Sequence, residues 1–290
     1  MGHAHLPAAT APRRRGPRRR GLAALALVAG TLTVASPAVA DHVREGNVRF
    51  KVTCELDASA PVDPIVFPGV AGASHRHDFF GQRRVDENTT TYAQLQAGRT
   101  TCNDPGDLAA YWAPAVRTAQ GWAEPGRLAV YYRRGNKHGD IEPYPAGLKV
   151  VAGYPSSPAG TYGWQCGTEG PEPTPIEDCG SSEQTMRIEF PDCWNGVDLD
   201  SADHRSHMAY SVYDPAVRAQ ACPASHPVPV PEATAYVNLP GITRADQITG
   251  LASGSVATVH ADLFNGWDVA RLAERVATCL NDLERCDSGG

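Results

Sequence analysis

Residues 255–280, SVATVHADLFNGWDVARLAERVATCL, have the pattern of a strand, a turn and a helix in succession. The first ten are rich in β-branched and apolar side chains, which is typical of a strand. Asn265-Gly266 then predicts a turn. From Val269 to Leu280, apolar residues recur at i, i+3, i+4, i+7, i+8 and i+11, which predicts an α-helix. Asp268, just before this run, is a good candidate for the helix N-cap.

Outside this stretch, strand-like segments predominate. Six more combine β-forming residues with flanking turn residues: 47–56, 127–133, 147–154, 185–190, 208–213 and 233–239. A weaker helical pattern covers Pro105 to Trp112. The pattern favours a mainly β fold: one antiparallel β-sandwich or jelly-roll-like domain over residues 41–290, with long disulfide-tied loops and a C-terminal helix.

The charge balance argues against nucleic acid as a partner. The 290 residues include 26 Lys+Arg and 32 Asp+Glu, for a formal net charge of −6. The first 40 residues hold six arginines and no acid, so the remainder carries 20 basic and 32 acidic residues, a net charge of −12. Nucleic-acid binding depends on dense positive charge. Abundant glycine (28) and proline (24) favour turns and loops over a helical bundle.

The first 40 residues have the pattern of a signal peptide. Arg13 to Arg20 is basic, Gly21 to Val34 is apolar and uncharged, and Ala38-Val39-Ala40 fits the small-x-small cleavage pattern. We therefore expect residues 1–40 to be removed and the protein to be secreted, without a membrane anchor after cleavage. An uncleaved anchor is the alternative, and the arginines leave both the general and the twin-arginine export routes open.

The eight cysteines all lie after this segment. An even number of cysteines in a secreted chain predicts disulfides. Closure of local loops favours Cys279 with Cys286 and Cys166 with Cys179, and then Cys54 with Cys102 and Cys193 with Cys222. A zinc site is the competing interpretation, but the chain has no C-x-x-C pair.

Six histidines fall in four short motifs. In the first, residues 74–81, His75 and His77 would lie on the same side of an extended strand, beside Asp78. Such a pair can supply two imidazoles to a metal ion or transfer protons near pH 7. In the fourth motif, residues 260–268, His260 and Asp262 alternate in the same way.

The other two motifs are richer in loop-forming residues. Residues 191–210 contain His204 and His207, which would share a face of a helical turn, with Asp203 beside them. Residues 222–231 hold His226 between a predicted half-cystine and several prolines, which should make this segment stiff.

We expect several of these side chains to converge on one cleft. The candidate catalytic residues are Asp262, Asp203, His260, His204, His207 and Asp78, and the candidate substrate-binding residues are His75, His77, His226, Tyr210, Trp194 and Trp267. No cofactor is firmly indicated, but His75, His77, His207 and His260 are the alternative ligands for a divalent metal ion. Taken alone, each histidine has a competing interpretation as a structural hydrogen-bonding group, and each tryptophan as part of the core.

The same blocks resemble the DUF1996 family from about Asn47 to Cys279. They are DPIVFPG at 63–69 with His75-Arg76-His77, TTC at 100–102 with YWAP at 111–114, FPDCWNG at 190–196 with LDS at 199–201, His204 and His207, CP at 222–223 with HPV at 226–228, and HADLFNGWD at 260–268. The family consists of secreted bacterial and fungal proteins that are sometimes joined to carbohydrate-binding modules. The resemblance therefore implies polysaccharide or oligosaccharide of a cell wall or plant wall as the partner, and it implies no particular reaction.

Three hypotheses follow. The first is a glycoside hydrolase in which carboxylates of the His/Asp motifs supply an acid and a base or nucleophile. The second is an enzyme with a histidine-ligated metal ion and a reactive water. The third is a non-catalytic glycan-binding protein whose tryptophans stack on sugars and whose histidines are structural.

Overall fold

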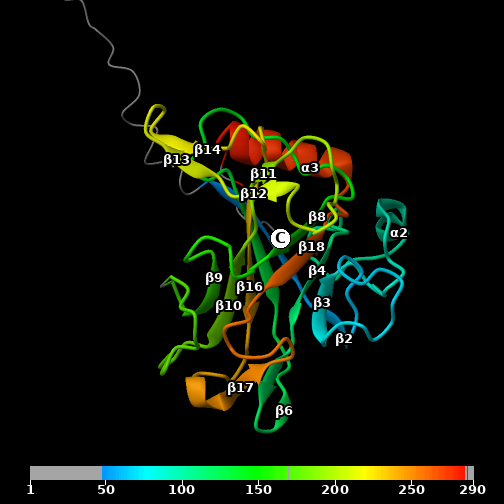
Figure 1. The fold of residues 1–290 in the computed structure, drawn as a ribbon, viewed down its shortest axis with the longest axis vertical. Helices are drawn as coiled ribbons and strands as arrows, with labels where there is room; N and C mark the ends of the chain where they lie inside the picture. The colour runs from blue at the N-terminus through cyan, green and yellow to red at the C-terminus, as the bar shows by residue number, and fades with distance from the viewer. Residues whose placement is uncertain (1–47, 169, 285, 287–290) are drawn as a thin grey trace, which may run out of the picture. The chain divides into compact units, whose positions relative to one another are not determined.

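Two five-stranded antiparallel sheets form most of the computed structural model, which describes residues 48–168, 170–284 and 286 (Figure 1). Sheet 1 has the order β1 (Arg49–Cys54), β7 (Leu128–Arg133), β16 (Glu232–Asn238), β10 (Gln184–Glu189) and β9 (Tyr162–Cys166). Sheet 2 has the order β2 (Leu56–Ala60), β3 (His77–Gly81), β4 (Ala110–Pro114), β18 (Ala261–Phe264) and β8 (Lys149–Ala152). The predicted mainly antiparallel β fold is confirmed.

Three strands of sheet 1, β1, β7 and β10, alternate between buried and more exposed residues. In β7, Leu128, Val130 and Tyr132 are buried, while Ala129, Tyr131 and Arg133 face outward. β10 has the same pattern. One face of sheet 1 therefore packs into the core and the other meets solvent, which is the usual arrangement in a sandwich.

The main core lies between the two sheets. It joins the inward residues of sheet 1 to those of sheet 2, including Phe80, Tyr111 and Leu263. A buried polar chain also links the sheets: the Tyr111 and Tyr132 hydroxyl oxygens are 2.6 Å apart, and Tyr111 donates to Asp107. The Trp267 indole N–H donates to Tyr132. Because each member has partners, this chain positions the sheets without leaving an unpaired polar group.

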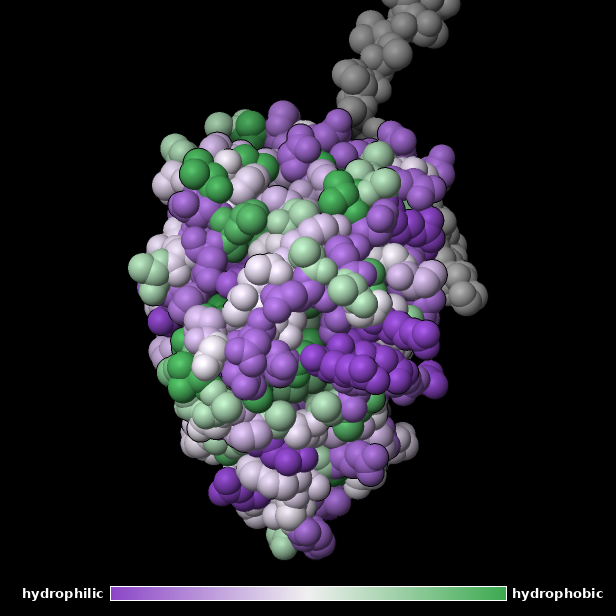
Figure 2. Space-filling view, turned by 90° about the vertical axis from the view of Figure 1, so that its right-hand side faces the viewer, coloured by the Kyte–Doolittle hydropathy of each residue, from purple (hydrophilic) through white to green (hydrophobic). Residues whose placement is uncertain are grey.

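The outer face of sheet 2 is covered. Phe79, Trp112 and Phe264 point away from the main core and pack with Ile65 and Leu95. Ile65 belongs to the loop between β2 and β3, and Leu95 to the short helix α2 (Tyr92–Gln96). We call this second cluster the satellite core; its members are Val62, Ile65, Phe79, Leu95, Ala110, Trp112 and Phe264. Figure 2 shows hydrophobic residues scattered among hydrophilic ones on this side of the molecule.

Three small antiparallel sheets build the loops that extend from the sandwich. They pair β12 (Met208–Ala209), β11 (Cys193–Trp194) and β15 (Val228–Pro229); β13 (Val212–Asp214) and β14 (Ala219–Ala221); and β17 (Ile248–Leu251), β5 (Val116–Thr118) and β6 (Gly121–Trp122). A 3₁₀ turn, η1 (Ala245–Gln247), precedes β17. These pieces position the segment 191–210 beside sheet 2, since Lys149 N of β8 donates to Leu199 O.

The C-terminal helix begins where the sequence predicts. Asp268 caps α3 (Val269–Arg275) by accepting from the Arg271 N–H at 2.8 Å. The helix then widens into a π-helix, η2 (Val276–Asn281). Leu272 and Val276 are buried as expected, but Val269 is 57% exposed, so the apolar face is narrower than the sequence pattern suggests. In η2 the extra residue per turn brings Cys279 to the core together with Leu280.

The four predicted disulfides are all confirmed: Cys54–Cys102, Cys166–Cys179, Cys193–Cys222 and Cys279–Cys286. Four disulfides are typical of a protein that folds outside the cytosol. The predicted signal peptide, residues 1–40, lies outside the described residues. In the described part of the chain, no helix is long and apolar enough to cross a membrane.

The helix expected over Pro105 to Trp112 is wrong. Residues 110–114 form β4, a central strand of sheet 2 with every residue buried. A strand buried on both faces shows no alternation, so its apolar run resembles a helix in sequence. The segment 156–182 is a disulfide-tied loop in part, because it also contributes β9 to the edge of sheet 1.

Candidate functional site

Three histidine side chains meet at one end of the outer face of sheet 2. His77 is the first residue of β3, His75 lies two residues before it, and His260 directly precedes β18. The intervening Arg76 points elsewhere, and its guanidinium lies 5.8 Å from the Trp122 ring centre. The alternation of an extended chain thus brings His75 and His77 to the same side, with ring centres 4.2 Å apart.

The imidazole nitrogens converge on one point. His260 Nε2 lies 3.2 Å from His75 Nε2 and 3.4 Å from His77 Nε2. One ring nitrogen of each of the three histidines lies within 4.8 Å of the other two. Four ligands arranged tetrahedrally at about 2.0–2.1 Å from a zinc ion are separated by about 3.3 Å. The observed spacing therefore fits three ligands of one tetrahedral ion.

Backbone carbonyls fix the tautomers of two of the rings. His77 Nδ1 lies 2.8 Å from Val62 O, and His260 Nδ1 lies 2.8 Å from Thr258 O. A carbonyl oxygen only accepts, so in each neutral ring Nδ1 carries the proton and Nε2 carries the lone pair. The two Nε2 lone pairs therefore face each other with no proton between them. This is the usual orientation of metal-ligating histidines, whose other nitrogen donates to a carbonyl or carboxylate.

Burial keeps these rings in their neutral form. Burial, with a smaller contribution from His260, lowers the pKa of His75 to about 4. The pKa of His77, which is fully buried, is lowered well below its usual range for the same reason. Burial also lowers the pKa of His260. Neutral imidazole is the form that binds metal ions.

Two buried carboxylates extend the group. One ligand atom each of Asp63, His77 and Asp262 lies within 4.8 Å of the others. Asp63 Oδ1 accepts from the N–H groups of Ile65 and Val66 and so shapes the loop. Burial raises the pKa of Asp63 despite these bonds. Burial, with Asp63 nearby, raises the pKa of Asp262 well above its usual range.

Asp262 is the most unusual of these groups. It is 1% exposed, and neither of its carboxylate oxygens has a hydrogen-bond partner among the described residues. The indole nitrogen of Trp112, its register partner on β4, also lacks a partner in the described part of the chain. Leaving a buried carboxylate without a partner costs several kcal/mol unless a proton or cation neutralises it. The raised pKa of Asp262 means that a proton neutralises this carboxyl group, and a cation bound beside it would displace that proton.

The group is open to solvent on one side, because His75 and His260 are partly exposed while His77 is buried. Gly153 (φ +86°) packs directly against the backbone of His260. A Cβ atom at position 153 would lie 2.6 Å from the His260 Cα, so only glycine fits there. Tyr154 follows Gly153 in the sequence, and the Arg205 guanidinium lies 5.0 Å from the centre of the Tyr154 ring. Residues 203–207 therefore lie near the opening without supplying a ring to the three-histidine group.

The histidines of segment 191–210 make local contacts instead. His204 Nδ1 lies 2.8 Å from Asp200 Oδ1, and its backbone has φ +58° in a turn rather than a helix. The His204 charge still lowers the pKa of Asp63, so the ring lies in the neighbourhood of the site. His207 is fully buried, with Nδ1 at 2.9 Å from Ser201 Oγ and Nε2 at 2.6 Å from Lys149 O. Both ring nitrogens of His207 are thus occupied, which removes it from the proposed metal ligands.

Two further candidates lie in the same loops. Asp203 is exposed, and its Oδ1 accepts from the Ser201 hydroxyl and from the N–H groups of Arg205 and Ser206. These bonds lower the pKa of Asp203, so it is an ionised carboxylate that stabilises a turn. His226 Nε2 lies 3.0 Å from Ser206 O and Nδ1 lies 2.9 Å from Ser225 Oγ. The structure does not bring either side chain into the three-histidine group.

Asp78 and Tyr210 are also held by structural contacts. Asp78 faces the opposite side of β3 from His77 and accepts from the Ser59 hydroxyl at 2.5 Å. Burial raises the pKa of Asp78 to about 6. The Tyr210 hydroxyl donates to Glu189 O at 2.9 Å. Neither side chain is directed toward the histidines.

The two tryptophans predicted to bind substrate, Trp194 and Trp267, differ in their exposure to solvent. Trp267 is 1% exposed and packs edge-on against Phe50 and Tyr132, so the expectation that it binds substrate is wrong: it is a core residue. Trp194 is partly exposed, and its indole N–H donates to Asp198 O at 2.6 Å.

Sequence reasoning did not select Asp63. This residue lies 14 positions before His77 and has no histidine beside it, so spacing gives no signal. A recognisable local signal is the Asp-Pro step at 63–64, which is typical of turns and accounts for the loop but not for the site.

The family model of DUF1996, a domain of unknown function, matches residues 63–267. The match covers well over half of the 290 residues, so the chain belongs to this family. No curated protein and no solved structure matches the chain.

Proposed function

We propose that this DUF1996 protein is a secreted, metal-dependent hydrolase whose centre is one divalent transition-metal ion on His75, His77 and His260. The single observation that carries the proposal is the convergence of imidazole Nε2 atoms at 3.2 and 3.4 Å, with the His77 and His260 lone pairs facing each other. A proton on His75 Nε2 would be shared only with the Nε2 lone pair of His260. A metal ion would bind the Nε2 lone pairs of all three rings.

The donor set favours a particular group of metals. Three neutral imidazoles suit Zn²⁺, Cu²⁺, Fe²⁺ or Ni²⁺ rather than Mg²⁺ or Ca²⁺, which prefer oxygen ligands. Three protein ligands with a fourth position toward solvent are typical of catalytic zinc, whereas structural zinc sites are closed by four. The partial exposure of His75 and His260 gives water and substrate access to that position.

The chemistry is attack by metal-activated water. An ion held by His75, His77 and His260 would lower the pKa of a bound water and so supply a nucleophile near neutral pH. The nucleophile would attack the electrophilic carbon of the substrate as the bond to the leaving group breaks, and the leaving group would take up a proton. The proton of that water would pass to bulk solvent, because burial raises the pKa of Asp63 and of Asp262, the two carboxyl groups that lie within 4.8 Å of a His77 ring nitrogen.

A polysaccharide is the substrate class that the family resemblance suggests, and we retain it. The candidate carboxylates for a two-carboxylate glycosidase mechanism, Asp262, Asp78 and Asp203, are either buried or held within a turn, which gives that mechanism less support. Asp262 is 1% and Asp78 4% exposed, and Asp203 is bound within its own turn. Metal-activated water requires no pair of accessible carboxylates.

Metal analysis tests the proposal directly. The secreted protein, purified without a histidine tag, should contain about one equivalent of a transition metal, or bind Zn²⁺, Cu²⁺ or Ni²⁺ after chelation with a stoichiometry of one. His75→Ala should lose this binding and remain folded, because the His75 ring makes no backbone hydrogen bond among the described residues. His226→Ala is the matched control, since it removes a partly exposed histidine outside the group.

Hydrolysis of a panel of wall polysaccharides, with chelator and after metal is restored, then tests the activity. Product release that chelator abolishes and metal restores supports the proposal. Equal metal binding by wild type and His75→Ala, or hydrolysis that persists in fully metal-free protein, contradicts it.

A further inference from the structure

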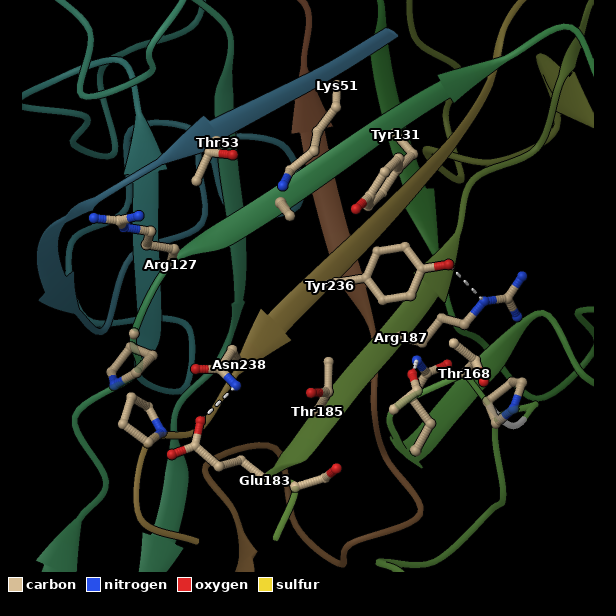
Figure 3. Close-up of a pocket in the computed structure, with 18 of the residues that line it drawn as sticks. Lys51, Thr53, Arg127, Tyr131, Thr168, Glu183, Thr185, Arg187, Tyr236 and Asn238 are labelled. Carbon is tan, nitrogen blue, oxygen red and sulfur yellow. Dashed lines mark hydrogen bonds between the residues drawn. The ribbon is translucent and has the colours of Figure 1, made fainter. Parts of the chain in front are cut away.

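Among the described residues, the outer face of sheet 1 is left open and carries a hollow of about 1750 Å³ (Figure 3). Its floor is formed by outward residues of the strands, among them Lys51, Tyr131, Arg187 and Tyr236. Residues 124–127, 167–168 and 170–172 form its borders. Five strands spaced about 4.8 Å apart make this floor about 19 Å wide. The hollow faces away from the three-histidine group, because the main core separates the two sheets.

Positive charge gathers in one half of the hollow. Arg49, Lys51 and Arg133 surround a single ring, with their cationic ends 5.1, 5.5 and 5.2 Å from the centre of Tyr131. Register brings them together: Lys51 pairs with Tyr131, and Arg49 with Arg133. Three like charges around one ring repel one another, and cation–π attraction of about 0.5–1 kcal/mol for each cation at an exposed site opposes this repulsion.

The nearby acids do not balance this charge. Arg133 lies 3.8 Å from Glu232, and Arg187 pairs with Glu189 at 2.7 Å. Arg49 and Lys51 make no ion pair with any residue in the described ranges. Without its first 40 residues the chain would carry a net charge of −12, so this half of the hollow is a local exception. An anionic ligand would be drawn to it and repelled from most of the remaining surface.

The rest of the floor offers groups that suit sugar hydroxyls. Figure 3 shows Tyr236, Thr185 and Asn238 along the floor beside the cationic half. The Tyr236 ring stands edge-on to Tyr131, with ring centres 5.4 Å apart. Glu183 is engaged by Asn238 and by the Gly241 N–H, so its charge is partly compensated. Three more glutamates line the hollow, Glu55, Glu124 and Glu172, and Glu55 is paired with Arg127 at 2.8 Å. The cations around Tyr131, together with the phenol rings, hydroxyls and amides beside them, match a linear polymer of carboxylated sugars.

We propose that the outer face of sheet 1 binds a linear polysaccharide whose sugar rings carry carboxylates. Arg49 and Lys51 contact the carboxylates, and the polar remainder of the floor contacts hydroxyls. This surface is separate from the three-histidine group and does not depend on the function proposed for it. If both are present, the sheet face holds the polymer while the metal centre acts elsewhere on the wall.

Binding of polygalacturonate, measured by calorimetry or by affinity electrophoresis, tests the proposal. Its fully methyl-esterified form is the matched ligand, because esterification removes the charge and leaves the chain of sugars. We expect polygalacturonate to bind at least tenfold more tightly than the ester, and this preference to weaken as salt rises. Equal binding of the two polymers, or no binding of either, overturns the proposal.

Variants locate the surface. Arg49→Ala/Lys51→Ala should raise the Kd for polygalacturonate at least tenfold, whereas Arg99→Ala, an exposed cation outside the hollow, should leave it unchanged. Thermal unfolding at the wild-type temperature shows that each variant is folded. If Arg99→Ala weakens binding as much as the double variant, the hollow is not the site.

Two further experiments distinguish this proposal from a general polyanion surface and from binding at the three-histidine group. A 20-nucleotide single-stranded DNA tests for a general polyanion surface, and binding as tight as that of polygalacturonate overturns the proposal. His75→Ala and chelated wild type should bind polygalacturonate as the native protein does. A loss of binding in either case assigns the polymer to the three-histidine group and overturns the sheet-face assignment.

Discussion

The two outer faces of the sandwich have the same construction and opposite surroundings. Each consists of every second residue along five antiparallel strands. On sheet 2 a loop and α2 cover these residues, so that Phe79 and Trp112 become core and His77 and Asp262 are buried. On sheet 1 no segment of the described ranges covers Lys51, Tyr131 and Tyr236, and the face remains polar.

The difference shows how a cover changes the chemistry of the residues beneath it. Burial drives the imidazoles and carboxylates of the sheet 2 face toward their neutral forms, as the low pKa of His75 and the raised pKa of Asp262 show. On the open face, Arg49 and Lys51 lie at the Tyr131 ring and form no ion pair with a described residue. The covered face therefore suits a metal ion, and the open face suits an extended anion.

The largest expected effect is on folding stability. Phe79→Ala removes a fully buried ring from the satellite core and should lower the free energy of unfolding by about 3–5 kcal/mol. Tyr236→Ala, on the open face, should cost about 1 kcal/mol or less. Denaturant titration of both variants measures the contrast. Similar losses would show that the open face is also packed against something.

The next effect concerns Asp107, in the polar chain that joins the two sheets. Burial raises its pKa from 3.8 to about 8, so the folded protein keeps a proton that the unfolded chain releases above pH 4. The stabilising contribution is complete below about pH 3.8 and is lost as pH rises through 8. In Asp107→Asn the amide can accept from the Ala109 N–H and donate to Tyr111, and it does not ionise.

Thermal melting between pH 4 and pH 8.5 tests this prediction. The melting temperature of Asp107→Asn, relative to wild type, should rise with pH by an amount that corresponds to a few kcal/mol. Taking the difference between the two proteins cancels the other titrating groups. Parallel curves would mean that the folded and unfolded forms of Asp107 have the same pKa.

Removal of the metal should have a smaller effect on stability. A ligand present at 100 times its Kd stabilises the native state by about 2.7 kcal/mol. Chelation should therefore lower the melting temperature of wild type and of His226→Ala, and should leave that of His75→Ala unchanged. A chelator effect of the same size in all three proteins would place the ion at some other position.

The smallest effect separates steric contact from backbone strain. Gly153 and Gly139 have φ of +86° and +82°, so alanine at either costs about 1 kcal/mol from its backbone alone. Only at Gly153 would the added Cβ approach His260, at 2.6 Å from its Cα; nothing lies within 4 Å at Gly139. We expect Gly153→Ala to weaken metal binding about tenfold and Gly139→Ala to leave it unchanged, as measured by calorimetry.

Much of this fold could be predicted from local patterns. The spacing of cysteines gave all four disulfides, and the apolar period after Asp268 gave the C-terminal helix. The helix predicted over residues 105–112 was wrong because β4 is buried on both faces, so its residues show no two-residue alternation of apolar and polar side chains. The cover on sheet 2 depends on how a distant loop packs, which no local pattern encodes.

The site was predictable only where neighbours in sequence share a strand. His75 with His77, and His260 with Asp262, follow from the two-residue period of an extended chain. His204, His207 and His226 lie in motifs just as dense, yet their ring nitrogens contact nearby carbonyls, hydroxyls or a carboxylate. Asp63 and the cations around Tyr131 reach their places through tertiary packing and strand register.

The strict alternation along β7 also bears on how such proteins diverge. Val130 and Tyr132 hold the interior while Tyr131 and Arg133 face outward, so the outward pair can mutate without loosening the interior. A lineage with this scaffold is free to exchange its recognition surface one residue at a time. Relatives could then adapt to differently decorated substrates while inheriting the same strands and the same sulfur bridges.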